Sequence, residues 1–232
     1  MKNFAVYLHG QVELNEPYTG RIRRITITGP ALLGLDWRPG QHVRVHVGDV
    51  GPRSRPGPLR TYSIWDYRTD TIDLCVLDHG DDTPGVRWAR TVRPGQDVVF
   101  TRPAGKLVPR KGEYHVFVGE ETASVAFGPM ARALPAGAPV FGVIEVDSPK
   151  DRLRLPDTVL WRYRDGASAV ASDRLVAEVR KLELPDEPGI AYVAGELRTL
   201  QAVRRHFVRE RGWPRKCVVI KPFWTPGRSG MD

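Results

Sequence analysis

The chain has 232 residues, of which 41% are hydrophobic and 27% are charged, a globular mixture that excludes fibrous and disordered architectures. Its 35 Lys and Arg against 27 Asp and Glu give a net charge of +8, but the basic residues are scattered and match no nucleic-acid-binding motif. No apolar run reaches the ~18 residues of a membrane helix, and no secretory signal opens the chain. Two cysteines exclude a disulfide framework or a thiolate metal cluster. We expect a cytoplasmic protein with no nucleic-acid or membrane partner and no bound metal.

Short strands separated by Gly/Pro turns fill the first hundred residues. The expected strands are residues 21–29, 42–47, 61–65, 71–77 and 97–100, and one short helix is expected at 84–92. The strand at 42–47 alternates polar and apolar residues, as a half-buried strand does. Regularly spaced short strands of this kind predict an antiparallel barrel or sandwich.

After residues 109–112 the strands begin to alternate with helices. Strands are expected at 114–118, 140–146, 158–163, 190–194 and 217–223, with helices at 122–134, 172–182 and 197–211. This alternation predicts a parallel sheet covered by helices. The expected fold is therefore of two domains in the α+β class: an N-terminal antiparallel β-barrel at 1–110 and a C-terminal α/β domain with a parallel sheet at 111–232.

The tetrapeptide Arg60-Thr61-Tyr62-Ser63 opens one of the barrel strands. Alternation along a strand places Arg60 and Tyr62 on one face and Ser63 on the other. A cation for a pyrophosphate, an aromatic surface for a ring and a hydroxyl donor are what a flavin needs. Taken alone, these four residues fit a surface arginine and a barrel-core tyrosine better than a flavin site.

A second segment, residues 78–89, combines a glycine-containing loop with the start of the short helix. Unpaired backbone N–H groups and the positive end of the helix dipole make such a place a phosphate seat. Together the two segments resemble the siderophore-interacting protein family, the FAD-dependent ferric-siderophore reductases of the ferredoxin-reductase superfamily. The family's R-x-Y-T is matched at 60–63, and its H-G-x-x-G-P-[AG]-S-x-W-A is matched by His79, Gly80, Pro84, Gly85, Trp88 and Ala89.

The resemblance continues through the second half of the chain. Residues 119–123 are similar to the family's G-D-E-T-A, residues 184–185 to its L-P, residues 192–196 to [WY]-V-A-G-E, and residues 203–206 to the [LV]-R-R-[HY] of its last helix. The match therefore covers nearly the whole chain.

The resemblance implies a role for each matched residue. Tyr62 packs against the isoalloxazine, Ser63 donates near N5, and Arg60 reaches the FAD phosphates. The cofactor-binding residues expected in the barrel domain are Arg60, Thr61, Tyr62, Ser63, Asp78, His79, Pro84, Gly85, Val86 and Trp88, of which Trp88 buttresses the turn. In the α/β domain Gly119, Thr122, Gly195 and Glu196 line the carboxyl ends of parallel strands, where such sheets bind ligands. NADPH or NADH is the expected occupant there.

Three residues depart from the family pattern. Thr83 replaces the loop glycine, Val86 replaces the phosphate-binding serine, and Phe127 follows G-D-E-T-A where a small apolar run is usual. Losing a hydroxyl donor to a phosphate weakens binding by ~1–3 kcal/mol. These departures bear on FAD retention and on the path of the nicotinamide.

Two functions follow from the sequence. The first is an FAD-dependent reductase that takes electrons from NADPH, NADH or a ferredoxin and passes them to a ferric siderophore or related Fe(III) chelate. The flavin carries this chemistry, so no catalytic side chain is assigned. Loop cations at Arg53, Arg55, Arg102, Lys106 and Arg110 are expected to attract an anionic chelate. The alternative is a repurposed scaffold, a biosynthetic enzyme or small-molecule binder without flavin redox chemistry.

Overall fold

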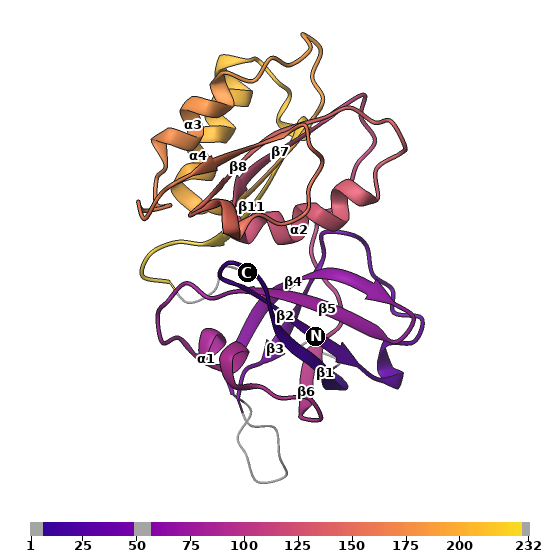
Figure 1. The fold of residues 1–232 in the computed structure, drawn as a ribbon. Coiled ribbons are helices and arrows are strands. Elements are labelled where there is room, and N and C mark those ends of the chain that lie inside the picture. Colours follow the sequence, from indigo (N-terminus) through magenta and orange to yellow (C-terminus); the bar gives the residue numbers. More distant parts are fainter. Residues whose placement is uncertain (1–6, 49–56, 229–232) are drawn as a thin grey trace, which may run out of the picture. The chain divides into compact units, whose positions relative to one another are not determined.

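A computed structural model describes residues 7–48 and 57–228 of the chain (Figure 1). The chain divides into two compact units, Met1–Lys106 and Leu107–Asp232. Within the described residues no helix is long and apolar enough to cross a membrane.

The first unit is a closed antiparallel barrel, as the sequence predicts. Its strands follow the order β1-β2-β5-β4-β3-β6 around the barrel. They are β1 (Tyr7–Thr19), β2 (Ile22–Thr28), β3 (His42–His46), β4 (Leu59–Arg68), β5 (Thr71–Leu77) and β6 (Asp97–Thr101), with one helix, α1 (Pro84–Thr91). Side chains such as Ile25, Ile27 and Phe100 fill the interior and are fully buried.

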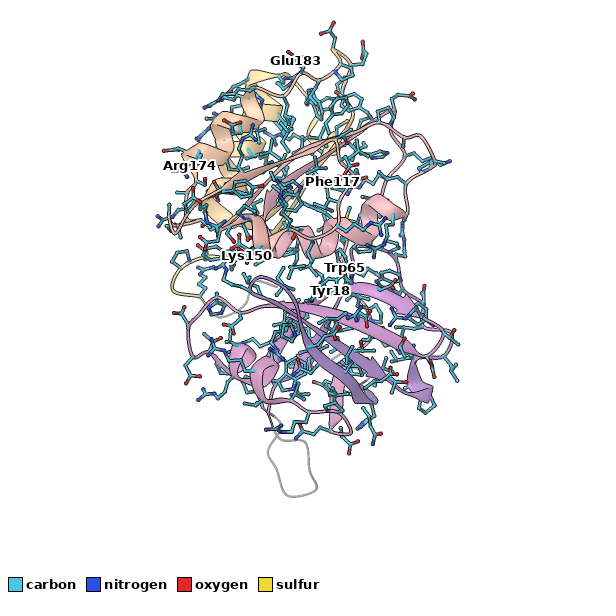
Figure 2. The ribbon with its side chains drawn as sticks, in the orientation of Figure 1. Tyr18, Trp65, Phe117, Lys150, Arg174 and Glu183 are labelled. Carbon is cyan, nitrogen blue, oxygen red and sulfur yellow. The ribbon has the colours of Figure 1, made fainter. Side chains whose placement is uncertain are left out.

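Strand β1 is the one barrel element that the sequence patterns did not predict. It is long, but only Leu8 and Val12 along it are buried, and Gly10 and Pro17 interrupt it. Such a strand lacks the apolar alternation that identifies its neighbours. On the barrel surface its Tyr18 ring meets Trp65 of β4 edge-on at 6.3 Å between centroids (Figure 2).

The second unit is a five-stranded parallel sheet in the order β11-β10-β7-β8-β9. The strands are β7 (His115–Glu120), β8 (Val140–Val146), β9 (Val159–Tyr163), β10 (Ile190–Glu196) and β11 (Val218–Trp224). The helices are α2 (Glu121–Arg132), α3 (Asp173–Arg180) and α4 (Leu197–Arg205). The predicted fold class is therefore confirmed for both units.

Two apolar cores cover the two faces of this sheet. One packs α3 and α4 against residues such as Val116, Val118 and Val143. The other packs α2 against Phe117, Ile144 and Tyr192, and Figure 2 marks Phe117 in the sheet. The strand order reverses between β7 and β10, so the carboxyl ends of these two strands form the switch point at which open α/β sheets bind ligands.

The predicted helix at 197–211 is present but changes its type in its second half. Helix α4 ends at Arg205, and His206–Glu210 continues it as one π-helical turn (η3). Such turns are rare insertions in helices and occur often at functional sites. A short 3-10 turn, Arg215–Cys217 (η4), then leads into β11.

Candidate functional site

Strand β4 and helix α1 bring four of the predicted cofactor residues together. The ring of Tyr62 stacks on that of Trp88 at 5.7 Å with 24° between planes. Gly85 lies against both Tyr62 and Arg60, because a Cβ at residue 85 would meet Tyr62 Oη at 2.7 Å and Arg60 Cγ at 3.4 Å. Only a residue without a side chain allows this approach.

The hydroxyl of Tyr62 is buried, and no partner for it lies among the described residues. Burial raises the pKa of this hydroxyl far above its usual value, although the Arg60 charge acts in the opposite direction. A buried phenol without a partner is costly, so the site provides a donor for a hydrogen-bond acceptor brought by a ligand.

The other β4 residues point elsewhere. Thr61 is exposed, and Ser63 pairs with His42 on the neighbouring strand β3, on the face opposite Tyr62 as the alternation predicts. The Arg60 guanidinium donates to the carbonyl of Leu59 at 2.9 Å, and within the described part of the chain no carboxylate pairs with it. Its charge is therefore available to an anion.

The loop before α1 is held by its own polar residues. Both carboxylate oxygens of Asp78 accept from the Arg90 guanidinium at 2.6 Å, and Arg90 is the main reason that the pKa of Asp78 lies below its usual value. His79 lies 3.3 Å from a carboxylate oxygen of Asp81 and 3.4 Å from Thr83 Oγ1. Asp78 and His79 thus shape the loop.

Thr83 is the N-cap of α1, and its hydroxyl accepts from the Val86 N–H at 3.5 Å. This is a long hydrogen bond, but it occupies a donor that a phosphate at this helix end uses. Pro84 has no N–H, and the Val86 side chain is buried. The remaining phosphate donors are the backbone N–H groups of this first turn.

These residues offer groups that suit FAD, but they leave few donors for its phosphates. The unpartnered Tyr62 hydroxyl and the Arg60 cation suit a ring system with a phosphate tail. The Thr83 cap reduces the number of free donors for that tail.

The second predicted cluster lies at the carboxyl ends of β7 and β10. Gly119, Gly195 and Glu196 end these strands, and Thr122 lies in the first turn of α2. A small cavity at this switch point is lined by Val118, Gly119, Glu120, Leu175, Val193, Ala194, Glu196, Thr199, Leu200 and Val203. The accessible volume of this cavity is about 10 Å³, room for about one water molecule, so a nucleotide at this switch point stays a prediction.

Glu120 occupies this edge, and the sequence reasoning did not single it out. It is 3% exposed and accepts from the Thr122 N–H at 2.8 Å, from the Thr122 hydroxyl and from Trp224 Nε1 at 3.0 Å. A Cβ on Gly195 would meet Glu120 Oε1 at 2.5 Å. Burial, with the neighbouring Glu121 charge, raises the pKa of Glu120 to about 7.

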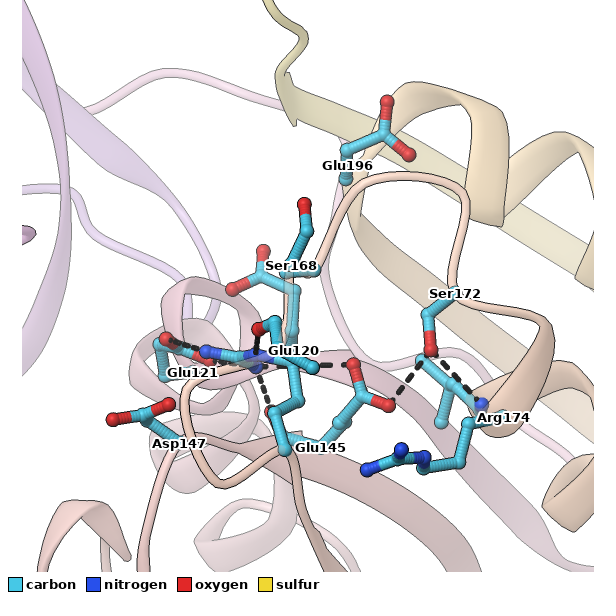
Figure 3. Close-up of polar contacts among 12 residues, drawn as sticks. Glu120, Glu121, Glu145, Asp147, Ser168, Ser172, Arg174 and Glu196 are labelled. Atoms are coloured by element: carbon cyan, nitrogen blue, oxygen red, sulfur yellow. Dashed lines mark hydrogen bonds and ion pairs between the residues drawn. The ribbon is translucent and has the colours of Figure 1, made fainter.

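Glu121 and Glu145 share one buried guanidinium, that of Arg164 (Figure 3). Arg164 Nη1 donates to Glu121 Oε2 at 2.6 Å and lies 3.8 Å from Glu145 Oε2. Glu145 Oε1 accepts from the Ser172 hydroxyl at 2.7 Å. Burial raises the pKa of Glu145, more than Ser172 and Arg164 lower it.

Glu196 caps α4 and fastens the loop before α3 to it. Its Oε2 accepts from the N–H of Thr199 at 2.9 Å and of Ala171 at 3.0 Å, while its Oε1 is buried without a partner in the described residues. Burial would raise the pKa of Glu196, but the backbone N–H donors outweigh it and lower the pKa. Four buried glutamates and one arginine thus form this edge: Glu120, Glu121, Glu145, Glu196 and Arg164.

Phe127 does not stand in the crevice. It is fully buried in the core under α2, where its ring lies 5.0 Å from that of Phe117. Its ring also contacts Gly119, because Phe127 Cε2 lies 3.3 Å from the position that a Cβ on residue 119 would take. Phe127 therefore supports the sheet.

Comparison with known proteins relates both units to one family. Residues 112–227 match the model of the siderophore-interacting protein family, and residues 48–107 match that of its FAD-binding domain. The chain belongs to the siderophore-interacting protein family. The predicted family is thereby confirmed, and the FAD-binding domain identifies this member as a flavin-dependent oxidoreductase.

Relatives of this family member include ferric vibriobactin reductase ViuB of Vibrio cholerae, which is 26% identical over 89% of this chain and 84% of its own. Among solved structures, a siderophore utilization protein from T. fusca has a TM-score of 0.82 at 24% identity, covering 98% of this chain and 95% of its own. The siderophore-interacting protein SipS from Aeromonas hydrophila has a TM-score of 0.81 at 26% identity, covering 97% and 94%.

Proposed function

We propose that the protein is a ferric-siderophore reductase that holds FAD on its barrel unit. The contact of Gly85 with Tyr62 and Arg60, inside the region that matches the FAD-binding domain, carries this proposal. FAD, when bound, supplies the electron transfer to Fe(III). A siderophore holds Fe(II) less tightly than Fe(III), so reduction releases the iron without hydrolysis.

The side chains of the barrel unit bind and orient the cofactor. Arg60 and the first turn of α1 hold the phosphates, and the buried Tyr62 hydroxyl donates to the cofactor. Trp88 fixes the Tyr62 ring by stacking on its face. Thr61 and Ser63 face away from Tyr62, so the donor role of Ser63 near N5 depends on the cofactor reaching that side of β4.

Exposed basic side chains attract the substrate electrostatically. Arg102 and Lys106 are exposed residues of the barrel unit, and Arg110 is exposed in the second unit, where it donates to the Lys216 carbonyl at 3.1 Å. Arg53 and Arg55 lie outside the described residues. An anionic ferric chelate is the class of substrate that such cations favour.

Pyridine nucleotide, NADPH or NADH, is the proposed electron donor, with Gly119, Thr122, Gly195 and Glu196 at its site. The reversal of strand order between β7 and β10 supports it. A ferredoxin is the alternative donor.

The repurposed scaffold remains a second candidate because of the helix end at Thr83. A cap from the protein's own hydroxyl, together with Val86 in place of a serine, leaves this phosphate seat weaker than the family pattern. A ligand without phosphates would suit such a pocket.

A visible absorption spectrum distinguishes the flavin reductase from the repurposed scaffold. The purified protein is mixed with FAD, desalted and scanned in the visible range, then given NADPH or NADH and finally a ferric siderophore. Retained flavin bands that bleach and then recover on adding the chelate are expected. Retained flavin that bleaches only with reduced ferredoxin would change the donor, and loss of all flavin on desalting would favour the repurposed scaffold.

A further inference from the structure

Most of the net positive charge of the chain comes from one segment of the second unit, contrary to the scattered distribution that the whole sequence suggests. Residues 197–216 hold seven Lys and Arg against one Glu, a net charge of +6, whereas the whole chain carries +8. This segment comprises α4, the π-helical turn η3 and the 3-10 turn η4.

Four of these arginines surround a groove of about 300 Å³. Its lining is Gln201, Arg204, Arg205, Val208, Arg209 and Arg215. Arg204 and Arg205 end α4, Arg209 lies in the π-helical turn, and Arg215 begins η4. Because η4 leads directly into β11, the groove lies at the amino end of the parallel strands. The crevice at Glu120 and Glu196 is at the opposite end of the same sheet.

No carboxylate neutralises this groove. All four arginines are exposed, and within residues 7–48 and 57–228 none of them is paired with an acid. Glu210, the one acid of the segment, is engaged elsewhere. Its Oε1 accepts from Arg180 at 2.9 Å, and its Oε2 lies 2.7 Å from His206 Nδ1.

The like charges of these arginines repel one another, and an anion bound in the groove would relieve the repulsion. Arg205 and Arg209 stand four residues apart, a spacing at which like charges repel on a helix. The guanidinium fork matches phosphate oxygens two at a time. The groove offers no aromatic ring for a base and a single apolar side chain, Val208, so the group that it fits is compact and highly charged.

We propose that this groove, here called the arginine groove, is a binding site for a di- or triphosphate group. It is independent of the flavin site, because its residues come from the other unit. Four cations around so small a volume match the three to four negative charges of such a group, and exceed what a monoanion can balance.

The test is calorimetric titration of the full-length protein with inorganic triphosphate at low and at physiological salt. Saturable binding of one triphosphate per chain is expected, weaker at higher salt. The double variant R205Q/R209Q should lose at least tenfold in affinity. Two matched controls, R198Q on the first turn of α4 and R60Q at the flavin site, should stay within twofold of the parent.

Three results overturn the proposal. The first is no saturable binding to the parent protein. The second is a loss in R60Q or R198Q as large as in R205Q/R209Q, which places the anion elsewhere. The third is tighter binding of a DNA duplex that the double variant abolishes, because the groove would then serve a nucleic-acid backbone. Equal thermal unfolding midpoints of parent and variants exclude misfolding as the cause of a loss, and R60Q separates this site from the flavin site.

Discussion

Glu120 stands in the space that Gly195 leaves empty. Its Oε1 lies 2.5 Å from the position of a Cβ on residue 195, and the same carboxylate accepts from Trp224 of β11. Residue 195 also has φ of +125°, a conformation that other residues rarely adopt. The carboxyl ends of β7, β10 and β11 are therefore joined through one buried acid.

The first prediction is that Glu120→Gln makes the stability of the protein less dependent on pH. The pKa of Glu120 is raised to about 7 in the folded state by burial and by Glu121, so the folded state binds more protons than the unfolded state between about pH 4.5 and 7. Stability thus falls as pH rises through this range. Glutamine does not titrate, so the loss of unfolding free energy between pH 5 and pH 8 should be smaller in this variant by on the order of 2 kcal/mol, measured by urea unfolding at both pH values.

Glu196→Gln is the matched control with the opposite sign. Backbone donors lower the pKa of Glu196 against the effect of burial, so its stabilisation is present above about pH 4.5 and is lost as pH falls. This variant should be less stable than the parent at pH 8. A smaller loss of unfolding free energy between pH 5 and pH 8 in both variants would mean that burial alone, without the backbone donors, determines the pKa of these two carboxylates.

The second prediction concerns Gly85→Ala. The added Cβ meets Tyr62 Oη at 2.7 Å, and overpacking of this kind costs about 1–3 kcal/mol, against a gain of about 0.5–1 kcal/mol in helix propensity. We expect a lower thermal midpoint and less retained FAD. Tyr62→Phe removes the contacted oxygen, so the double variant should recover the thermal midpoint. A double variant as unstable as Gly85→Ala would refute the contact.

The third prediction is that Arg164→Met unfolds the second unit readily. It leaves Glu121 and Glu145 buried without their cation, a change that costs about 3–5 kcal/mol. Arg162→Met is the control on β9, because Arg162 pairs with Glu178 at a partly exposed position and should cost at most about 1 kcal/mol. Similar losses of unfolding free energy in the two variants would contradict the buried role of Arg164.

The fourth prediction is that Thr83→Gly tightens FAD binding. Removing the hydroxyl frees the Val86 N–H for a phosphate, and glycine at an N-cap costs the helix only a few tenths of a kcal/mol. The dissociation constant, from fluorescence titration, should fall ~3- to 10-fold. Thr83→Val keeps the Cβ and loses the oxygen, so it should also tighten binding. An unchanged constant in both variants would show that the cap does not compete with the cofactor.

Much of the fold was predictable because its strands carry regular patterns. The alternation at 42–47 and the apolar runs of the parallel sheet lie where β3, β7, β8 and β10 are found. Strand β1 was missed since only Leu8 and Val12 along it are buried, and the π-helical turn at the end of the helix predicted at 197–211 was missed because no residue type marks such a turn.

The contacts of the candidate sites were predictable only where both residues belong to motifs that lie close together in the sequence. The spacing of Tyr62 and Gly85 pointed to one place because the family motif contains both. The pairing of Glu121 with Arg164 spans 43 residues, and no local pattern connects them. An available signal was the acid at or just before the end of three of the five strands: Glu120 in β7, Glu145 in β8 and Glu196 in β10.

The outer strand of the parallel sheet has one further consequence. Strand β11 pairs with β10 on one side, and Pro222 lies within it opposite Gly195. Proline has no N–H, so a ladder of hydrogen bonds along this strand cannot be completed. An edge interrupted in this way is a poor template for a strand of a second molecule. Pro222 thus disfavours sheet extension across β11 by another copy of the chain.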